Sequence, residues 1–384
     1  MLAQTLARLG CQTRWFTSSF DHYQKRQRLP RRQSVVPEPN LTISVLDGLG
    51  YSKNISLRRI VHNRAFARAF TVESAGATAL PDVIVTDIPT TEGAAAAVAF
   101  GAKHNIPTIV SIRDLWPDFF ADHAPAMARP LVRTLVAPLE MQARYACANA
   151  DSIVGISDRY LDWGLAKAGR SRSEQDAVFP LGYAPARISE ARAGEICSAL
   201  GIAASDRVVS FVGSWGHTYD IDLVERTARA LLDRPGVKFL IAGEGEQSIR
   251  MRPRLAELGN VILPGWIDAE AIAAVLQRTD IGLLPYTAMA PQGLPNKVFE
   301  YMAYGAYQLA SIGGELTTFY KASGAGSPIT YPNAERLAQA IRDTLADEDV
   351  LARRADRIAS FNRTWDADRI YQQFASHIVA IATR

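Results

Sequence analysis

Short apolar runs alternate with amphipathic helical patterns along the whole chain. In the first half, the runs that predict strands are residues 11–18, 41–48, 81–89, 107–114 and 151–158. In the second half they are residues 206–216, 237–246, 260–267, 280–286 and 306–311. Helical patterns lie between them, for example at 92–105 and 131–150. This alternation predicts an α/β chain with parallel sheets.

The length and one interruption of the pattern predict two domains. A chain of 384 residues exceeds one ordinary core, and the periodicity breaks at "FPLGYAPARIS" (179–189). We therefore expect two doubly wound Rossmann-like domains facing each other across a cleft. They would comprise residues 1–185 and 186–363, with an amphipathic C-terminal helix at 364–384 packing back on the N-terminal domain.

The start of the chain departs from the usual plan of such a domain. A doubly wound domain ordinarily opens with a strand and a glycine-rich turn, whereas this chain opens with the helical pattern "LAQTLARLG" (2–10). We therefore expect the first strand of the N-terminal domain to be missing from this sequence.

Composition excludes several classes of protein. Hydrophobic residues make up 48% and charged residues 21%, as in a globular protein that is not disordered. The net charge of +3 is too small to argue for nucleic-acid binding. No apolar run approaches the roughly 20 residues of a membrane helix. The three cysteines (Cys11, Cys147 and Cys197) have no CxxC spacing, so we expect neither zinc nor disulfides and a reduced, cytoplasmic setting.

The stretch "GLPNKVFEYMAYG" (293–305) carries the clearest candidate chemistry. A helix that starts here would present free N–H groups and Lys297 to a phosphate. Glu300 lies on the same face, and a carboxylate can accept hydrogen bonds from two adjacent hydroxyls. However, Lys–Glu pairs at this spacing are common on solvated helices, and the spacing alone favours that interpretation.

Motifs on either side of this stretch favour the ligand-binding interpretation over the solvated pair. "VSFVGSWG", "FLIAGEGE", "VILPGWIDAEAI" and the 293–305 stretch, in this order, resemble the nucleotide-sugar-binding signature of glycosyltransferase family 4, which has the GT-B fold. "PTIVSIRDLWPDFF" and "EMQARYACANADSIVGIS" resemble a subgroup that acts in bacterial surface-polysaccharide assembly (O-antigen, capsule and exopolysaccharide). "FTSSFDHYQKRQ" resembles that subgroup's first loop after its second strand, which agrees with a missing first strand.

The resemblance implies a retaining glycosyltransferase. It would move a sugar from a nucleotide diphosphate sugar, with UDP as the expected nucleotide, to a glycan or polyprenyl-diphosphate-linked acceptor. It would act in the cytoplasm or peripherally at the inner face of the cell membrane. The resemblance implies no metal cofactor, because protein groups stabilise the leaving diphosphate. The sequence likewise has no DxD-like acidic cluster in a suitable loop.

The resemblance also implies roles for particular residues. Glu300 would bind the ribose hydroxyls, and Lys297 would stabilise the diphosphate. The other residues expected at the donor are Gly213, Ser214, Gly243, Gly245, Trp266, Ile267, Gln292, Gly293, Leu294, Pro295 and Asn296.

Several donor-side positions depart from the family pattern or allow two interpretations. Gln292 stands where the family usually has a Glu that contacts the sugar, and residues 214–217 stand where many members have an Arg and a Lys. Backbone N–H groups at 213–216 would then help to bind the diphosphate. We expect Trp215 to form a wall of the cleft. We expect Trp266 to be a core residue, with contact to the base as the alternative.

The N-terminal half contributes the acceptor side. "SIRDLWPDFF" places Arg113, Asp114 and Asp118 after a strand, facing the cleft. Asp114 would orient an acceptor hydroxyl, or else pair with Arg113 and cap the next helix. Glu92 would contact substrate or simply complement a helix dipole.

Lys and Arg concentrate at 20–32 and 57–70, interleaved with aromatic residues. These segments are either solvated faces or a patch that meets anionic lipid. Two other functions also remain open for the chain. One is a sugar-nucleotide 2-epimerase, and the other is a non-catalytic GT-B-like scaffold of a polysaccharide assembly complex.

Overall fold

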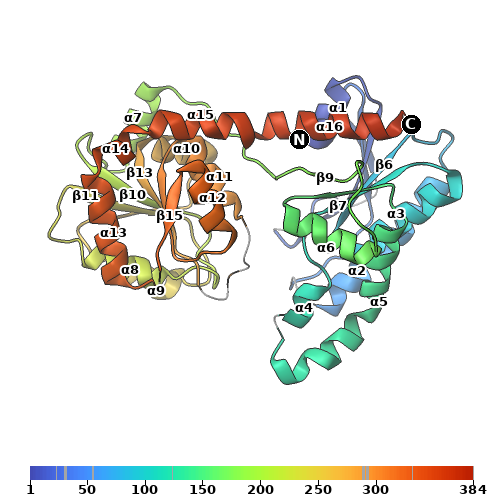
Figure 1. Cartoon of the computed structure of the whole chain (residues 1–384), viewed down its shortest axis with the longest axis horizontal. Helices are drawn as coiled ribbons and strands as arrows, with labels where there is room; N and C mark the ends of the chain where they lie inside the picture. Colours follow the sequence, from blue (N-terminus) through green and yellow to red (C-terminus); the bar gives the residue numbers. More distant parts are fainter. Residues whose placement is uncertain are drawn as a thin grey trace. The chain divides into compact units, whose positions relative to one another are not determined.

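The computed structural model describes residues 1–22, 24–29, 33–53, 56–122, 124–287, 290, 294–330 and 332–383. The chain forms two compact units (Figure 1). Unit 1 comprises Met1–Leu181 and Asp368–Arg384, and unit 2 comprises Gly182–Ala367.

Unit 1 contains a four-stranded parallel sheet in the order β6 (Ile84–Ile88), β7 (Thr108–Ile112), β8 (Ser152–Gly155) and β9 (Ala177–Val178). A second sheet has the order β1 (Thr13–Ser18), β5 (Leu41–Leu46) and β4 (Gln33–Glu38). Strands β1 and β5 are parallel, whereas β4 runs antiparallel to β5. A small hairpin pairs β2 (Phe20–Asp21) with β3 (Arg26–Gln27). The sequence pattern did not predict these antiparallel pairings.

Helix α3 (Thr91–His104) lies between two other helices of unit 1, because its alanine-rich sequence allows close approach. Helix α3 packs against both α2 and α5. At Gly101 of α3, an added Cβ would lie 2.3 Å from Thr108 Cγ2 on β7, so the helix lies directly on the sheet. The helices are α1 (Leu2–Arg8), α2 (Leu57–Ala75), α3 (Thr91–His104), α4 (Asp118–Asp122), α5 (Arg129–Ala148), α6 (Asp158–Ala168) and α16 (Ala367–Ala382), with a 3₁₀ turn at Ala126–Ala128.

The C-terminal helix α16 belongs to unit 1. Its residues Phe374, Ile378 and Ile381 are buried in one cluster with Ile109 and Val154 of the sheet. The ring of Phe374 also stacks on Phe179, with 4.7 Å between the ring centroids. Apolar burial therefore holds the last helix against the strands of the first unit.

Unit 2 contains one six-stranded parallel sheet. Its order is β12 (Val261–Gly265), β11 (Val237–Ala242), β10 (Arg207–Val212), β13 (Thr279–Leu284), β14 (Tyr307–Ala310) and β15 (Gly326–Pro328). Apolar clusters cover both faces, which is why these strands read as continuous apolar runs. The direction of strand order reverses between β10 and β13, and ligands bind at such switch points in open α/β sheets.

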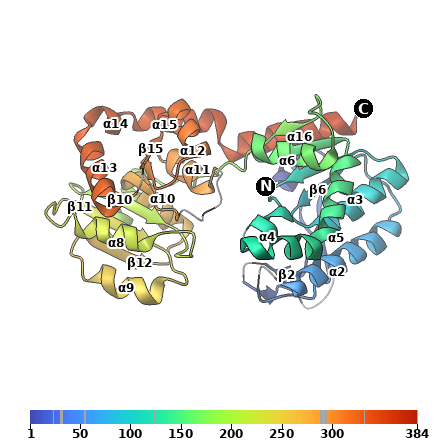
Figure 2. The same ribbon diagram turned by 60° about the horizontal axis from the view of Figure 1, so that its bottom comes forward.

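Helices lie on both sides of this sheet (Figures 1 and 2). They are α7 (Glu190–Ala199), α8 (Ile221–Arg229), α9 (Ser248–Ala256), α10 (Ala269–Arg278), α11 (Asn296–Ala303), α12 (Glu315–Ser323), α13 (Ala334–Ala346), α14 (Glu348–Ala352) and α15 (Arg354–Thr364). Of these, α11 begins at the carboxyl side of the switch point and carries Lys297 and Glu300.

Candidate functional site

The loops after β10 and β11 pack directly on each other at the carboxyl edge of the unit 2 sheet. Gly243 has φ of +109°, and a Cβ there would lie 2.0 Å from the carbonyl oxygen of Gly213. A Cβ at Gly245 would lie 2.8 Å from backbone atoms of Trp215. Close backbone packing therefore accounts for both glycines, and their role at the donor stays a prediction.

This packing uses some of the N–H groups that were expected to face a diphosphate. The N–H of Gly213 donates to Ala242 O (3.0 Å), and the N–H of Trp215 donates to Glu244 O (3.0 Å). The N–H groups of Ser214 and Gly216 have no backbone acceptor within the described part of the chain. These two N–H groups are thus the ones in this loop that a ligand could engage.

Lys297 and Glu300 occupy the first two turns of α11, and Lys297 points back toward β10. The Lys297 ammonium donates a hydrogen bond to the carbonyl of Val212 and lies 3.7 Å from Glu300 Oε2. It also lies 5.5 Å from the centroid of the Phe211 ring. Only 10% of the Lys297 side chain and 18% of the Glu300 side chain are exposed. The pair is therefore a largely buried ion pair, which differs from the solvated surface pair that spacing alone favoured.

Burial shifts both members of this pair toward their neutral forms. Burial lowers the pKa of Lys297, although the Glu300 carboxylate raises it part of the way back. Burial raises the pKa of Glu300, and Lys297 offsets part of that rise. Each charge is thus held at a cost in desolvation, as is common where a polar ligand binds.

A fully buried tyrosine fixes α11 to the sheet. The Tyr301 hydroxyl accepts from the N–H of Val212 (3.3 Å) and lies 3.2 Å from the carbonyl oxygens of Ser210 and Leu283. Its ring lies over Gly282, where an added Cβ would meet ring atoms at 2.6 Å. The sequence analysis missed Tyr301, although its position next to Glu300 and the glycine in "DIGLL" were available signals.

Two further tyrosines tie together the loops at the switch point. The hydroxyls of Tyr219 and Tyr286 lie 3.3 Å apart, and their ring centroids are 4.8 Å apart. The N–H of Asp220 donates to Pro285 O (2.6 Å), which joins the same two loops. Burial raises the pKa of Tyr219, and the Glu300 carboxylate adds to the rise. Tyr219 therefore lies in the electrostatic environment of the Lys297–Glu300 pair, and the sequence analysis missed both tyrosines.

The environments expected for both tryptophans of this region were wrong, whereas contact of Trp266 with the donor stays a prediction. Trp215, expected as a cleft wall, is fully buried in the core cluster with Phe211 and Phe239. Trp266, expected in the core, is 76% exposed at the carboxyl end of β12. It follows Gly265, whose φ of +77° turns the chain away from the sheet. Trp266 is therefore available to a ligand, and Trp215 is not.

The remaining donor-side predictions fall partly outside the described residues. Leu294 and Pro295 lead into α11, which begins at Asn296. Gln292 and Gly293 lie outside the residues that the structure describes. Ile267 follows Trp266 and is partly buried against the core.

On unit 1, Asp114 follows β7 beside an arginine that the sequence analysis did not assign to the site. Its Oδ1 accepts a hydrogen bond from the N–H of Leu115 (2.8 Å). Burial raises the pKa of Asp114, while the Leu115 N–H and the positive charge of Arg59 counteract the rise. The Arg59 guanidinium lies 4.1 Å from the ring centroid of Trp116. The expected pairing of Asp114 with Arg113 is replaced by this proximity to Arg59.

Glu92, at the start of α3, is also buried. Its Oε2 lies 3.4 Å from the Thr91 hydroxyl, and burial raises its pKa. Its Oε1 is buried without a hydrogen-bond partner among the described residues. Contact of Glu92 with substrate stays a prediction.

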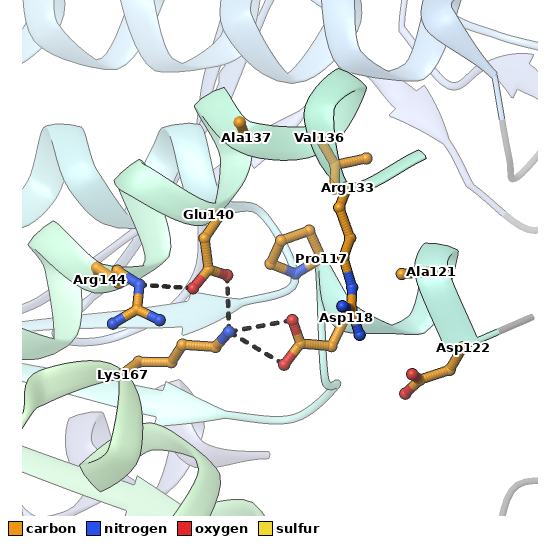
Figure 3. A pocket seen from close by; sticks show the side chains of 10 residues that line it. All are labelled: Pro117, Asp118, Ala121, Asp122, Arg133, Val136, Ala137, Glu140, Arg144 and Lys167. Atoms are coloured by element: carbon orange, nitrogen blue, oxygen red, sulfur yellow. Dashed lines mark hydrogen bonds and ion pairs between the residues drawn. The ribbon is translucent and has the colours of Figure 1, made fainter. Parts of the chain in front are cut away.

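Other side chains of unit 1 engage Asp118, and its place at a cleft stays a prediction. The Trp163 indole donates to Oδ2 (2.7 Å), and Lys167 donates to Oδ1 (3.0 Å). Lys167 also donates to Glu140 (2.6 Å). The group borders a pocket of about 420 Å³ between α4, α5 and α6 (Figure 3). Asp118 is therefore part of an ion-pair network within unit 1.

Neither a metal centre nor a membrane-spanning helix occurs in the part of the chain that the structure describes. No three His, Cys, Asp or Glu side chains there come together as metal ligands. Among the same residues, none of the helices is both long and apolar enough to cross a bilayer.

Part of unit 2 matches a known protein family. Residues 206–347 match the family model described as "Glycosyl transferases group 1". This segment includes β10 to β14 and α11, and thus both Lys297 and Glu300. No curated protein matches the chain in sequence.

Solved structures match over 88% to 100% of the chain. Sucrose-phosphate synthase from Thermosynechococcus elongatus is 18% identical, with a TM-score of 0.69 over 100% of this chain and 92% of its own. A trehalose-6-phosphate protein from E. coli, bound with UDP-2-fluoro glucose, is 11% identical, with a TM-score of 0.67 over 100% and 95%. HepE from Anabaena in complex with UDP is 16% identical, with a TM-score of 0.63 over 88% and 86%. The fold is thus GT-B, with two Rossmann-like domains.

Proposed function

We propose that this protein is a retaining glycosyltransferase that transfers a sugar from a UDP-sugar to a glycan or polyprenyl-diphosphate-linked glycan acceptor in polysaccharide biosynthesis. The observation that carries the proposal is the buried Lys297–Glu300 pair at the start of α11, beside the switch point of the unit 2 sheet. The group 1 glycosyltransferase match over the same residues supports it. The structures of HepE with UDP and with UDP-glucose support the choice of donor.

The donor would make separate contacts with the two members of the pair. The diphosphate accepts hydrogen bonds from the first N–H groups of α11 and from the Lys297 ammonium. The Glu300 carboxylate accepts hydrogen bonds from both ribose hydroxyls. The exposed Trp266 stacks on or beside the base. No divalent cation is required, because the helix N-terminus and Lys297 stabilise the charge on the leaving diphosphate.

The chemical step follows from these contacts. The bond between the anomeric carbon and the diphosphate oxygen breaks, and Lys297 stabilises the negative charge that develops on that oxygen. The acceptor hydroxyl attacks from the same face, so the anomeric configuration is retained. Asp114 of unit 1 orients the acceptor hydroxyl, and its raised pKa suits it to hold the proton during transfer.

One assay tests the proposal against the two alternatives. The full chain is incubated with radiolabelled UDP-sugars, with and without membrane-extracted lipid-linked acceptor. We expect UDP release and labelled lipid only when acceptor is present, with the anomeric configuration of the donor kept in the product. Release of UDP and a C2-inverted sugar without acceptor would identify a 2-epimerase. UDP binding without any turnover would identify a scaffold, and either result would overturn the proposal.

A further inference from the structure

Four basic side chains lie around the side chain of Tyr51 in unit 1. The Lys25 ammonium lies 4.8 Å and the Arg59 guanidinium 5.7 Å from the centroid of the Tyr51 ring. His22 Nδ1 lies 2.5 Å from the Tyr51 hydroxyl. The His62 ring meets the Tyr51 ring edge-on, with 5.2 Å between the ring centroids. We call His22, Lys25, Arg59 and His62 the basic cluster.

The basic cluster forms where two loops and a helix meet, after the carboxyl ends of β1 and β5. The β2–β3 hairpin follows β1 and carries His22 and Lys25, and the loop after β5 carries Tyr51. The first two turns of α2 supply the other two members. The two basic segments of the sequence, 20–32 and 57–70, therefore meet around one tyrosine.

The basic cluster is costly to hold together, and a negatively charged ligand would offset that cost. Lys25 has φ of +54°, in a region that favours glycine and asparagine. Burial, followed by the charges of Lys25 and Arg59, lowers the pKa of His22. Burial and the charge of Arg59 lower the pKa of Lys25, while Asp21 counteracts this. Asp21 itself forms an ion pair with Arg28 (3.0 Å). The basic cluster thus has the electrostatic character of an anion site.

The basic cluster adjoins Asp114, the residue proposed to orient the acceptor hydroxyl. The Arg59 guanidinium lies 4.1 Å from the ring centroid of Trp116. Trp116 follows Asp114 by two residues, which span about 7 Å at most. The positive charge of Arg59 also counteracts the effect of burial on the pKa of Asp114. One bound molecule can therefore contact Arg59 and Asp114 together.

Glu92 adds a hydrogen-bond acceptor near the same arginine. Its Oε1 is buried without a hydrogen-bond partner among the described residues, and its charge interacts with that of Arg59. An unsatisfied buried oxygen is costly, and a hydroxyl that donates to it removes the cost. The site thus combines cations for an anionic group with two carboxylates for hydroxyls, those of Glu92 and Asp114. This combination matches a sugar that carries phosphate.

We propose that the acceptor is a single sugar residue joined directly to a diphosphate, with the diphosphate on the basic cluster and the attacked hydroxyl at Asp114. This inference rests on the proposed function and specifies its acceptor. The short path from Arg59 to Asp114 leaves room for one sugar between the two groups. Each further sugar residue would carry the attacked hydroxyl away from the diphosphate. Glu92 accepts a hydrogen bond from another hydroxyl of the same sugar.

The proposal also gives the protein a place in a reaction sequence. Its acceptor must come from a phosphosugar transfer, in which a lipid phosphate attacks a nucleotide diphosphate sugar and releases the nucleoside monophosphate. The protein then joins the acceptor hydroxyl oxygen to the anomeric carbon of the donor sugar. UDP leaves with the bonding electrons, and Asp114 receives the hydroxyl proton. The product is a disaccharide on the diphosphate, which later glycosyl transfers would extend.

The length of the acceptor tests the proposal. The full chain is assayed with UDP-sugars and with phytanyl-diphosphate-linked N-acetylglucosamine, glucose or galactose, or a disaccharide of each. Octyl glycosides of the same sugars lack the diphosphate, and hexose 6-phosphates carry phosphate without lipid. We expect kcat/KM for a monosaccharide diphosphate to exceed that for its disaccharide and its octyl glycoside by about tenfold or more. Equal values, or a preference for a hexose 6-phosphate, would overturn the proposal.

Variants connect this preference to the basic cluster. Lys25→Gln and Arg59→Gln should each raise KM for the monosaccharide diphosphate by about tenfold, because each removes a charge-assisted contact. The Kd for UDP should stay that of the wild type. Arg58→Gln, at an exposed position beside Arg59, is the control and should change neither quantity. Far-UV circular dichroism shows which variants fold, and Lys25→Gln decides the test if Arg59→Gln does not. An unchanged KM in Lys25→Gln would overturn the proposal.

A binding measurement separates failure of this inference from failure of the proposed function. Calorimetry, with the donor site saturated by UDP, follows binding of a water-soluble citronellyl-diphosphate-linked monosaccharide. Binding that Lys25→Gln weakens about tenfold, without any transfer, would support the ligand and refute glycosyl transfer. Transfer that does not depend on acceptor length would support the proposed function and refute this inference. Absence of both binding and transfer would refute both.

Discussion

The ammonium of Lys297 lies 3.7 Å from the carboxylate of Glu300, one turn along the same helix, and both side chains are largely buried. Tyr301, the next residue, holds that helix to β10 and β13 by hydrogen bonds to their backbone. The position of the pair is therefore set by the sheet and not by the helix alone. A nucleoside diphosphate would offer phosphate oxygens to the Lys297 ammonium and two hydroxyl donors to the Glu300 carboxylate.

Glu300→Ala should remove the protein's selectivity for ribose. If the carboxylate binds both ribose hydroxyls, the wild type binds UDP more tightly than 2′-deoxy-UDP. The variant should bind UDP about 10- to 100-fold more weakly, because charge-assisted hydrogen bonds contribute about 1.5–3 kcal/mol. Isothermal titration calorimetry with both nucleotides measures this. Glu257→Ala, an exposed carboxylate of the same unit, is the control. An unchanged preference for UDP in Glu300→Ala would place the ribose elsewhere.

Lys297→Met should weaken binding of the diphosphate and lower the rate of transfer. The variant's affinity for UDP should fall toward the wild-type affinity for uridine, because uridine lacks the diphosphate that Lys297 would bind. We expect kcat to fall by about 10²–10³, as when a group that stabilises a leaving charge is removed. Lys321→Met, on the exposed side of α12, should change neither quantity. If Lys297→Met keeps the wild-type kcat, the leaving group is stabilised by other residues.

The unit 2 sheet could be predicted because its strands are buried on both faces. Such strands read as uninterrupted apolar runs that end in glycine or proline, and "VVSFVG" and "FLIAG" are examples. In contrast, β4 (Gln33–Glu38) is exposed along most of its length and shows no alternation. Its antiparallel place beside β5 depends on a tertiary contact that the local sequence does not encode.

Only the part of the candidate site that lies in one local motif could be predicted from the sequence. Lys297 and Glu300 follow from one local motif and its helical spacing. The assignment of the two tryptophans failed because Trp215 and Trp266 both follow a strand and a glycine, so their local sequences look alike. The packing of the β10 and β11 loops buries Trp215, whereas Trp266 follows the edge strand β12 and is exposed. Tyr219 and Tyr286 are 67 residues apart and meet only in the folded sheet.

Trp266→Ala should weaken nucleotide binding with little effect on stability. The side chain is 76% exposed, so its removal leaves no cavity. Loss of stacking on a base should cost about 1–3 kcal/mol of binding. Intrinsic fluorescence checks this, because UDP should quench the wild type more than the variant. Trp15→Phe, at an exposed position of unit 1, serves as the control. Equal quenching in Trp266→Ala and wild type would exclude contact with the base.

Asp114→Asn should slow transfer without affecting the donor. Because burial raises the pKa of Asp114, activity that needs its carboxylate should decline, as pH falls, at a higher pH than for an ordinary aspartate. The variant should lose this acidic limb together with most of kcat, while its Kd for UDP stays that of the wild type. The measurements are a pH–rate profile and a UDP titration. Asp122→Asn, an exposed neighbour, is the control. A Kd for UDP that changes with Asp114→Asn would contradict a purely acceptor-side role.

The stability of unit 1 should depend on pH through Asp176, whose side chain is fully buried against Arg170. Burial alone would raise the pKa of Asp176, but hydrogen bonds from Arg170 and from the N–H groups of Ser173 and Ile153 lower it from 3.8 to about 2. A carboxylate with a lowered folded-state pKa stabilises the fold above its unfolded pKa, and this contribution is lost as pH falls through the folded value.

Wild type should therefore exceed Asp176→Asn in the free energy of unfolding by about 2 kcal/mol or more at pH 7. The difference should shrink between about pH 4 and pH 2, as the wild-type carboxylate takes up its proton. Urea unfolding, followed by circular dichroism across this range, measures the difference. Asp158→Asn, whose side chain is 77% exposed beside Arg172, should show almost no such dependence, since exposed ion pairs contribute little. A difference between wild type and Asp176→Asn that stays constant from pH 7 to pH 2 would mean that hydrogen bonding alone, and not the charge of Asp176, stabilises this part of unit 1.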